Sequence, residues 1–395
     1  MTPKKVVMKD TTITRDMVEE MRAKLGMKLR VGQSTHNEYA TRMAILKFTE
    51  GIGDPNPLWS DKEYAGKSRY GKIVAPPSFV WACFAHVIFG WRGLGGFHAG
   101  CDVEFMKPVF IGDKISAECI FKSFEGPKAS SYAQETVIDH FQNQYWNQNG
   151  ELIARYHWWV VHFARAKARK KKKKYDGLEL PHPWTDEQLE QIEQEILSEE
   201  IRGAKPRYWE DVEIGEEIGP VVKGPLGITD EIAYIIGGGV PIPRLQAHGV
   251  ALRSYQKHPA WAFRDPNTSA NEPIFAVHYN RAAANAMGLP QSYDVGMQRH
   301  CWGIHLITNW MGDDAWVKRS YTEYGKFVYL SDVVWIKGKV TEKYIDEEGD
   351  HCIHIERSAI NQRHENVMPG YAVVALPSRQ SDSSPLDKRI SHERN

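Results

Sequence analysis

The sequence predicts an α+β protein made of two similar halves, each a long helix wrapped by an antiparallel sheet. Three observations favour this fold class. An amphipathic helix that runs into a glycine-rich turn occurs twice, in "YATRMAILKFTEGIGDPNP" and in "ITDEIAYIIGGGVPIP". A mostly apolar helix follows each turn, from about Pro77 and from about Gly296. A run of alternating strands then follows in each half.

The two glycine-rich turns align residue by residue, which indicates an internal repeat. Gly51 falls opposite Gly237, and both turns end in Pro-x-Pro. The second copy then carries an insertion over residues 244–277, after which Trp59 of the first copy falls opposite His278. The chain therefore repeats one order of elements, with extra material in the second half.

The strand segments also match between the halves. "VFIGDKISAECIFKSFE" in the first half corresponds to "VYLSDVVWIKGKVTEKY" in the second, and each opens with a Gly-Asp or Ser-Asp turn. In the first half, Asn149-Gly150 has the composition of a two-residue hairpin turn between long antiparallel strands. "CIHIERSAINQRHENVMPGYAVVALP" is the weaker counterpart in the second half.

A basic linker and a helix separate the halves. The run Arg165–Lys174 is either a solvated linker or a patch for the phosphates of a nucleotide-bearing thioester. Thr185 and Gln188 form a capping box that opens a linker helix. We therefore expect a first domain over 1–165, a linker over 166–205, a second domain over 206–377 and a disordered polar tail over 378–395.

Composition excludes several classes of protein and partner. Hydrophobic residues make up 42% of the 395 residues, charged residues 25%, and the formal net charge is zero, so no nucleic-acid partner is expected. The five cysteines are scattered, which favours neither disulfides nor zinc and suggests the cytoplasm. The stretch "FVWACFAHVIF" is too short to span a membrane, and we do not expect the protein to bind one. We expect no metal site and no nicotinamide, flavin or ATP.

Two stretches carry a resemblance to a known family. "GDPNPLWSDKEYA", followed by "GKIVAPPSF", resembles the N-terminal domain of MaoC-like dehydratases, and "RYWEDVEIGEEIGPVVKGPLGITDEIAYIIG" resembles the opening of a second such domain. The resemblance implies a double hotdog fold and an acyl thioester substrate, with coenzyme A as part of that substrate and no other cofactor. It further implies reversible hydration of a trans-2-enoyl thioester to the (R)-3-hydroxyacyl form, in fatty acid metabolism. A homo-oligomer is implied, and a heteromer is an alternative.

The family's hydratase motif is an aspartate, then four residues, then a histidine, with Asn-Pro between them. The first half keeps Asp54 and Asn56 but has Trp59 in place of the histidine, and the second half keeps only His278. The resemblance therefore makes His278 the first candidate for an acid/base, although a lone histidine is often structural.

The carboxylate that would partner His278 stays open at this level. Asp294 precedes the second long helix, where it either faces the pocket or caps the helix. Glu272 is a further candidate. Asp54 either crosses from the first half or, with Asn56, forms an Asx-type turn that shapes its loop.

Substrate-binding roles are assigned by analogy to Gly296, Arg299, Tyr293 and Asn56. Gly296 opens the second long helix, where free backbone N–H groups are suited to hold the thioester oxygen. Arg299 either binds a carboxylate or phosphate of the substrate or pairs with an acid across the domain interface. Tyr293 either lines the acyl pocket or belongs to the core.

Two other functions compete with hydration. A hotdog thioesterase needs a carboxylate that activates water, and Asp54 or Asp294 is suited to that role. The other alternative is a non-catalytic acyl-binding subunit of a heteromeric dehydratase, which needs no catalytic carboxylate. The incomplete motif in both halves favours this alternative.

Overall fold

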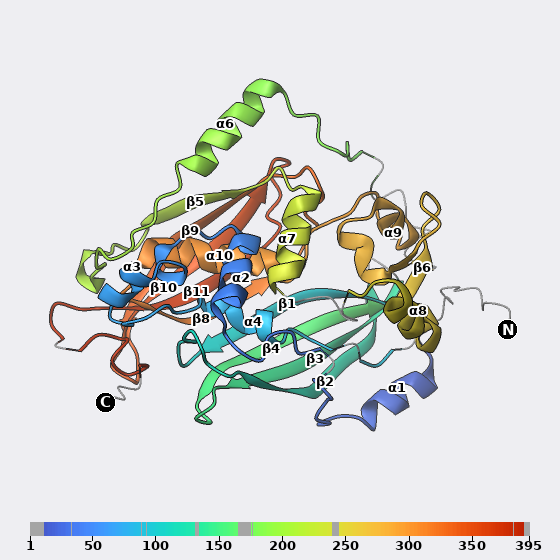
Figure 1. Ribbon diagram of the computed structural model, residues 1–395, viewed down its shortest axis with the longest axis horizontal. Helices are drawn as coiled ribbons and strands as arrows, with labels where there is room; N and C mark the ends of the chain where they lie inside the picture. The colour runs from blue at the N-terminus through green and yellow to red at the C-terminus, as the bar shows by residue number, and fades with distance from the viewer. Residues whose placement is uncertain are drawn as a thin grey trace.

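The protein folds on one continuous antiparallel sheet, described by a computed structural model (Figure 1). The structure describes residues 12–390 apart from 33, 88, 92, 131–133, 165–174, 176, 239–244 and 382. Within these residues, nine strands lie in the order β2-β3-β4-β1-β8-β11-β10-β9-β5. A separate two-stranded ribbon, β6-β7, lies in the insertion of the second half.

The first half supplies four neighbouring strands, and the expected hairpin is present, but its loop has three residues, 148–150, between the paired Asn147 and Glu151. Gly150 has a φ of +74°, which is the left-handed conformation that this turn requires. The strands are β1 (Gly95–Phe105), β2 (Ser116–Ser130), β3 (Gln134–Trp146) and β4 (Leu152–Phe163).

The second half supplies the other five strands and joins the first edge to edge. β1 pairs with β8, with Val103 opposite Ser320, so the two half-sheets form one surface. The strands are β5 (Glu217–Lys223), β8 (Trp316–Glu323), β9 (Val334–Ile345), β10 (His351–Asn361) and β11 (Gly370–Leu376).

The two repeated amphipathic helices, α2 (Arg42–Ile52) and α7 (Ile228–Gly238), lie side by side (Figure 1). Glycine makes the contact possible at aligned positions: a Cβ on Gly51 would lie 2.7 Å from the oxygen of Ala233, and a Cβ on Gly237 would lie 2.1 Å from the oxygen of Lys47. This reciprocal contact gives the two halves an approximate twofold relation. The aligned turn after Gly238 lies outside the described residues.

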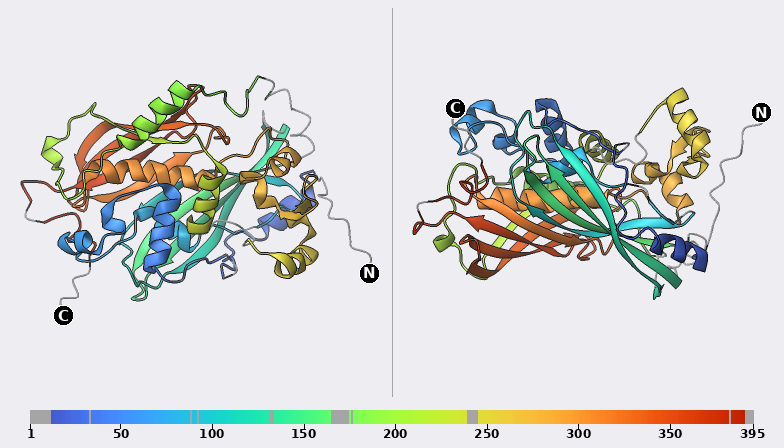
Figure 2. Two further views of the ribbon diagram at one scale, coloured as in Figure 1. Left: turned by 45° about the horizontal axis from the view of Figure 1, so that its top comes forward. Right: turned by 90° about the horizontal axis from the view of Figure 1, so that it is seen from below.

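The long helix expected from Gly296 is present. α10 (Gly296–Met311) is 16 residues long, and its side chains from Met297 onward are buried. It packs on β5, β8, β9 and β11, so the second half is a helix wrapped by a sheet (Figure 2). The apolar sequence of this helix is therefore explained by burial on all sides.

The matching long helix expected from Pro77 in the first half is wrong. The chain forms only a short 3₁₀ turn, η2 (Pro77–Phe79), and the single turn α4 (Val80–Cys83). Phe84 is already extended, with φ −157° and ψ 124°. Residues 84–94, apart from 88 and 92, are then without helix or strand.

Hydrogen bonds from outside the helix explain why it ends at Cys83. Asn37 Nδ2 donates to the oxygen of Ala82 at 2.6 Å, and the His36 backbone N–H donates to the oxygen of Cys83 at 2.8 Å. Tyr145 Oη donates to Phe84 at 2.6 Å, and Asn143 Nδ2 donates to Ala85 at 2.7 Å. These donors satisfy the carbonyl groups that another helical turn would have used.

Shorter elements make up the rest of the described chain. The capping box of Thr185 and Gln188 is present at the start of α6 (Asp186–Leu197), and the basic run over 165–174 lies outside the described residues. The remaining elements are α1 (Arg15–Arg22), η1 (Pro57–Trp59), α3 (Lys62–Lys67), η4 (Trp209–Asp211), α8 (His248–Lys257), η5 (Pro259–Trp261), β6 (Ala262–Arg264), β7 (Asn271–Pro273), η6 (Ile274–His278) and α9 (Arg281–Ala286).

The expectation of a disordered tail from residue 378 is wrong for the part that the structure describes, up to Ile390. Leu386 is fully buried, and Arg389 donates to Asp350 at 2.5 Å. Lys388 and Lys318 also donate to Asp350, each at 2.9 Å. Buried apolar contact and paired charges thus hold a segment whose polar composition resembles that of a disordered one. Among the described helices, none has the length and apolar character needed to cross a bilayer.

Asn143→Ala is expected to lower the free energy of unfolding by about 3 kcal/mol, because it removes a buried hydrogen-bonding group and leaves its partners unsatisfied. Besides donating to Ala85, Asn143 accepts from Trp158 Nε1 at 3.0 Å. Urea unfolding of the purified protein measures the change. Gln144→Ala, on the other face of the same strand, is the control and is expected to change stability by less than about 0.5 kcal/mol. Equal losses for the two variants would contradict this account.

Candidate active site

A cavity of about 940 Å³ lies between the inner face of the first half-sheet and the start of α10. It occupies the side where the first half lacks a long helix, and the non-helical segment 84–94 lines it instead. Most of its wall is apolar or aromatic, and the polar groups are few. Such a cavity is suited to an acyl group held beside a small number of reactive side chains.

His278 lies in the wall of this cavity, at the end of η6. Its Nδ1 is 2.9 Å from the carbonyl oxygen of Tyr293. Because a carbonyl only accepts, Nδ1 carries the proton and Nε2 is left with a free lone pair. Burial lowers the pKa of His278, against an opposing effect of the Asp294 charge. The imidazole is therefore neutral at pH 7 and in the form that takes up a proton.

Asp294 also lies in the cavity wall, but it is bound to Arg299 in a two-pronged ion pair. Arg299 Nε and Nη2 donate to the two carboxylate oxygens of Asp294, each at 2.7 Å. Arg299 Nη1 donates to the backbone oxygens of Lys326 and Val367. Both side chains are at most 2% exposed.

This ion pair corrects two sequence-based assignments. Asp294 is neither a free base beside His278 nor the cap of α10, because no side chain caps that helix and its N-cap residue is Val295. Arg299 has its donors occupied by Asp294 and backbone oxygens, so it has no free fork for a substrate anion. The pair instead fixes the entry of α10 on the sheet.

The start of α10 faces the cavity with unpaired backbone N–H groups. Gly296 and Met297 line the cavity, and the first turn of a helix has no internal acceptors for its N–H groups. A Cβ on Gly296 would lie 3.2 Å from the ring of Tyr324, so glycine lets the helix start close to that ring. The helix dipole adds positive potential at this point, which favours an oxyanion. Tyr293 lines the same cavity, which favours the alternative that it lines the acyl pocket.

Asp54 and Asn56 lie outside this cavity, so the structure does not bring them to His278. Asp54 Oδ1 accepts from the Asn56 N–H at 3.1 Å, and Asn56 Oδ1 accepts from the Leu58 N–H at 2.9 Å, which are the Asx turns of the alternative reading. Both side chains are buried. These contacts favour the structural role in the loop, and the assignment to catalysis and substrate binding stays a prediction.

Buried partners from the second half hold the Asp54 loop. His305 Nε2 of α10 lies 3.7 Å from Asp54 Oδ1 and 2.6 Å from Glu199 Oε1. Lys223 donates to the oxygen of Gly53 at 2.6 Å. An imidazole thus lies near the motif aspartate, but in a buried cluster whose residues do not line the cavity.

Sequence reasoning missed several polar residues of the cavity, among them His86, His98 and Tyr324. Burial lowers the pKa of His86 to about 4 and that of His98 to about 3, so both are neutral at pH 7. The ring of His98 lies 5.0 Å from that of Tyr324. His86 stood out only as a histidine within an apolar stretch, and the other two lie in no motif.

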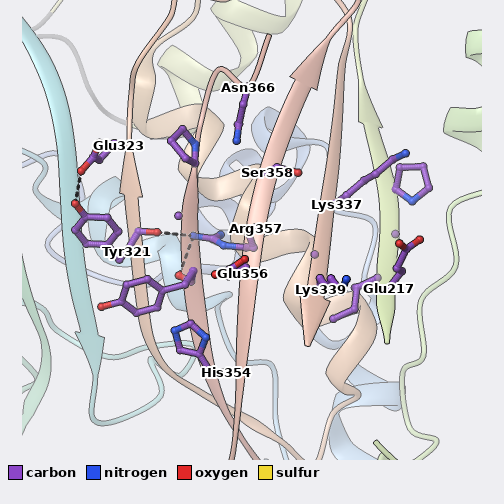
Figure 3. Close-up of a pocket in the computed structure, with 17 residues that line it drawn as sticks. Glu217, Tyr321, Glu323, Lys337, Lys339, His354, Glu356, Arg357, Ser358 and Asn366 are labelled. Atoms are coloured by element: carbon purple, nitrogen blue, oxygen red, sulfur yellow. Dashed lines mark hydrogen bonds between the residues drawn. The ribbon is translucent and has the colours of Figure 1, made fainter. Parts of the chain in front are cut away.

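A second hollow, of about 910 Å³, lies on the opposite face of the second half-sheet (Figure 3). Its charges are mixed, with Lys337 and Lys339 beside Glu217 and Glu356. Its histidine, His354, is engaged by Thr341 Oγ1 at 2.8 Å. The described residues that line this groove include no helix start, so the inner cavity, which has both a helix start and a buried neutral histidine, is the better candidate for an active site.

Comparison with known proteins finds relatives of part of the chain. Residues 30–156 match the family model described as the FAS1-like dehydratase domain region. A UPF0336 protein of Streptomyces avermitilis is 46% identical over 106 residues, which is 25% of this chain and 67% of that protein. A UPF0336 protein of Streptomyces griseus is 25% identical over 120 residues, covering 28% of this chain and 76% of its own length.

Solved structures show the same fold at low sequence identity. A MaoC-like dehydratase matches 91% of this chain and all of its own, with a TM-score of 0.62 and 14% identity. A Mycobacterium tuberculosis protein with a double hotdog fold matches 89% of this chain and 96% of its own, at a TM-score of 0.51 and 9% identity. The expected double hotdog fold is thereby confirmed.

Asp294→Asn is expected to lower the free energy of unfolding by about 3 kcal/mol or more, because it leaves the buried Arg299 charge without its partner. Chemical denaturation measures the loss. Glu272→Gln, on the half-exposed β7, is the control and is expected to change stability by less than about 0.5 kcal/mol. A fully stable Asp294→Asn variant that has lost only catalytic activity would restore Asp294 as the base.

Proposed function

The chain belongs with the UPF0336 proteins in the MaoC-like dehydratase family, in its double hotdog form, and we propose from this premise that it is a hydro-lyase acting on acyl thioesters. The reaction is the reversible addition of water to a trans-2-enoyl thioester of coenzyme A, which gives the (R)-3-hydroxyacyl form. One observation carries the proposal: His278, with Nδ1 fixed and Nε2 free, shares a cavity with the uncapped start of α10.

The chemistry of hydration matches these two features. His278 Nε2 takes a proton from water as the water oxygen attacks the β-carbon of the enoyl group. The thioester oxygen becomes enolate-like, and the N–H groups of Gly296 and Met297 stabilise the charge that develops there. The imidazolium of His278 then returns a proton to the α-carbon, so that one water has added across the double bond. The nearby Asp294 carboxylate stabilises the transient positive charge on His278.

The cavity also supports a large acyl group. Its volume of about 940 Å³ is more than a short aliphatic chain would fill. Its wall includes the aromatic side chains of Phe141, Trp158 and Phe275. Thioester hydrolysis is less well supported, because it requires a free carboxylate and both Asp54 and Asp294 are engaged elsewhere. We propose a substrate on coenzyme A, no further cofactor, and a homo-oligomeric or heteromeric assembly.

His278→Ala is expected to lower kcat/KM for hydration by at least about a hundredfold, because the variant lacks the general base. The assay follows loss of the enone absorbance for a panel of trans-2-enoyl-CoA thioesters, from short-chain to ring-bearing. His248→Ala is the control, since His248 is exposed at the start of α8 and lies away from the cavity. A His278→Ala variant with the wild-type rate would refute the assignment.

The pH dependence of kcat/KM provides a second test. The base must be neutral, and burial lowers the pKa of His278 below its ordinary value of 6.5. The rate is therefore expected to fall only as the pH drops below 6.5, and to be level between this limb and neutral pH. An acid limb centred above pH 6.5 would show that another group titrates.

A further inference from the structure

A fully buried carboxylate lies just behind one wall of the cavity. Asp139, on β3, is 0% exposed. Each of its carboxylate oxygens lies 2.9 Å from Trp91 Nε1, and its Oδ2 lies 3.1 Å from His162 Nε2 on β4. The His162 contact has the distance of an ion pair without the alignment of a hydrogen bond. We call Asp139, Trp91 and His162 the β3–β4 polar cluster.

The cluster reaches the cavity through two of its members. Trp91 and His162 line the cavity, whereas Asp139 supports them from behind. Trp91 belongs to the segment that replaces the missing helix of the first half. A Cβ on Gly96 would lie 3.1 Å from His162 Nδ1, and Gly96 also lines the cavity, so glycine leaves this edge of the imidazole uncovered.

This cluster lies apart from the start of α10. The start of α10 packs on Tyr324, which directly follows β8, whereas His162 is on β4. In the order β4-β1-β8, two strand spacings separate the two places, or roughly 10 Å. A thioester at α10 would therefore place the remote part of its acyl group near His162.

Burying a carboxylate costs free energy that a purely structural role would not require. A buried carboxylate loses its hydration, and apolar residues of similar volume generally fill a core with equal or greater stability. Around it the wall is apolar, with Phe89, Val160 and Phe141. A polar point in an apolar part of a cavity wall is the arrangement that fixes one polar group of a ligand.

We propose that the β3–β4 polar cluster binds a hydroxyl group on the acyl part of the substrate, remote from the thioester. This inference rests on the proposed acyl thioester substrate. His162 turns Nε2 to Asp139 and leaves Nδ1 for the ligand. A hydroxyl group can hydrogen-bond to Nδ1 in either protonation state of His162. It donates its proton to Nδ1 of the neutral ring, and its oxygen accepts from the Nδ1–H of the charged ring. Asp139 and Trp91 position the ring.

The test compares pairs of acyl-CoA thioesters of equal length, with and without a hydroxyl group near the end of the acyl chain. Calorimetric titration with the saturated thioesters measures the ratio of the two dissociation constants. The wild-type protein is expected to bind the hydroxylated member about tenfold more tightly for at least one chain length, the value of one well-formed hydrogen bond. His162→Phe is expected to reduce this ratio to about one, since phenylalanine cannot form that bond.

Two further variants keep the test decisive. His157→Phe makes the same substitution on the other face of β4 and is expected to leave the ratio unchanged. Gly96→Ala covers the His162 edge without touching Asp139, and it is expected to reduce the ratio even if His162→Phe fails to fold. Equal binding of both members of every pair by the wild-type protein would overturn the proposal, as would an unchanged ratio in folded His162→Phe.

Binding and turnover separate this proposal from the proposed function. If hydroxylated thioesters bind preferentially but no enoyl thioester is hydrated, the polar cluster stands and the hydratase assignment fails. If enoyl thioesters are hydrated without any preference for a hydroxyl group, the hydratase assignment stands and the polar cluster has no role in selecting the substrate.

Discussion

The hydrogen bonds that end the short helix α4 at Cys83 are the constraint on which the candidate site depends. Asn37, Tyr145 and Asn143 bind carbonyl groups that another turn of helix would have used. Without that turn, the inner face of the first half-sheet is left uncovered by helix, in contrast to the second half, where α10 fills the same position. The cavity and its lining segment 84–94 follow from this difference.

The two halves share a framework and use it for different purposes. The glycine contact between α2 and α7 keeps the halves in register, at positions that align in the repeat. In the first half, the motif aspartate lies 3.7 Å from His305 of the second half, and His305 in turn contacts Glu199, so this buried cluster contributes to the joint between the halves. In the second half, a buried ion pair of Asp294 and Arg299 fixes the helix start that faces the cavity. Both clusters follow the rule that a buried charge needs a partner.

The groups that pair with buried charges explain why the site was only partly predictable. The family resemblance, together with the repeat alignment, led to His278 and Gly296, and both lie in the cavity wall. It also led to Asp54, Asn56, Asp294 and Arg299, whose charges or amides are engaged by other groups. Whether a carboxylate is a base or half of an ion pair depends on its neighbours in space. For Asp54 the neighbour is His305, which lies far along the chain and has no motif of its own.

The sequence by itself determined the α+β class, the internal repeat, the capping box of α6, the Asn149-Gly150 hairpin and the helix from Gly296. Each of these rests on periodicity or on short-range chemistry between residues that are close in the chain. Only the tertiary structure decided the length of the first helix, the packing of the segment up to Ile390, the pairing of Asp294, and the meeting of Asp139 with Trp91 and His162. These features depend on hydrogen bonds and buried charges between distant segments, and such pairings leave no periodic trace in the sequence.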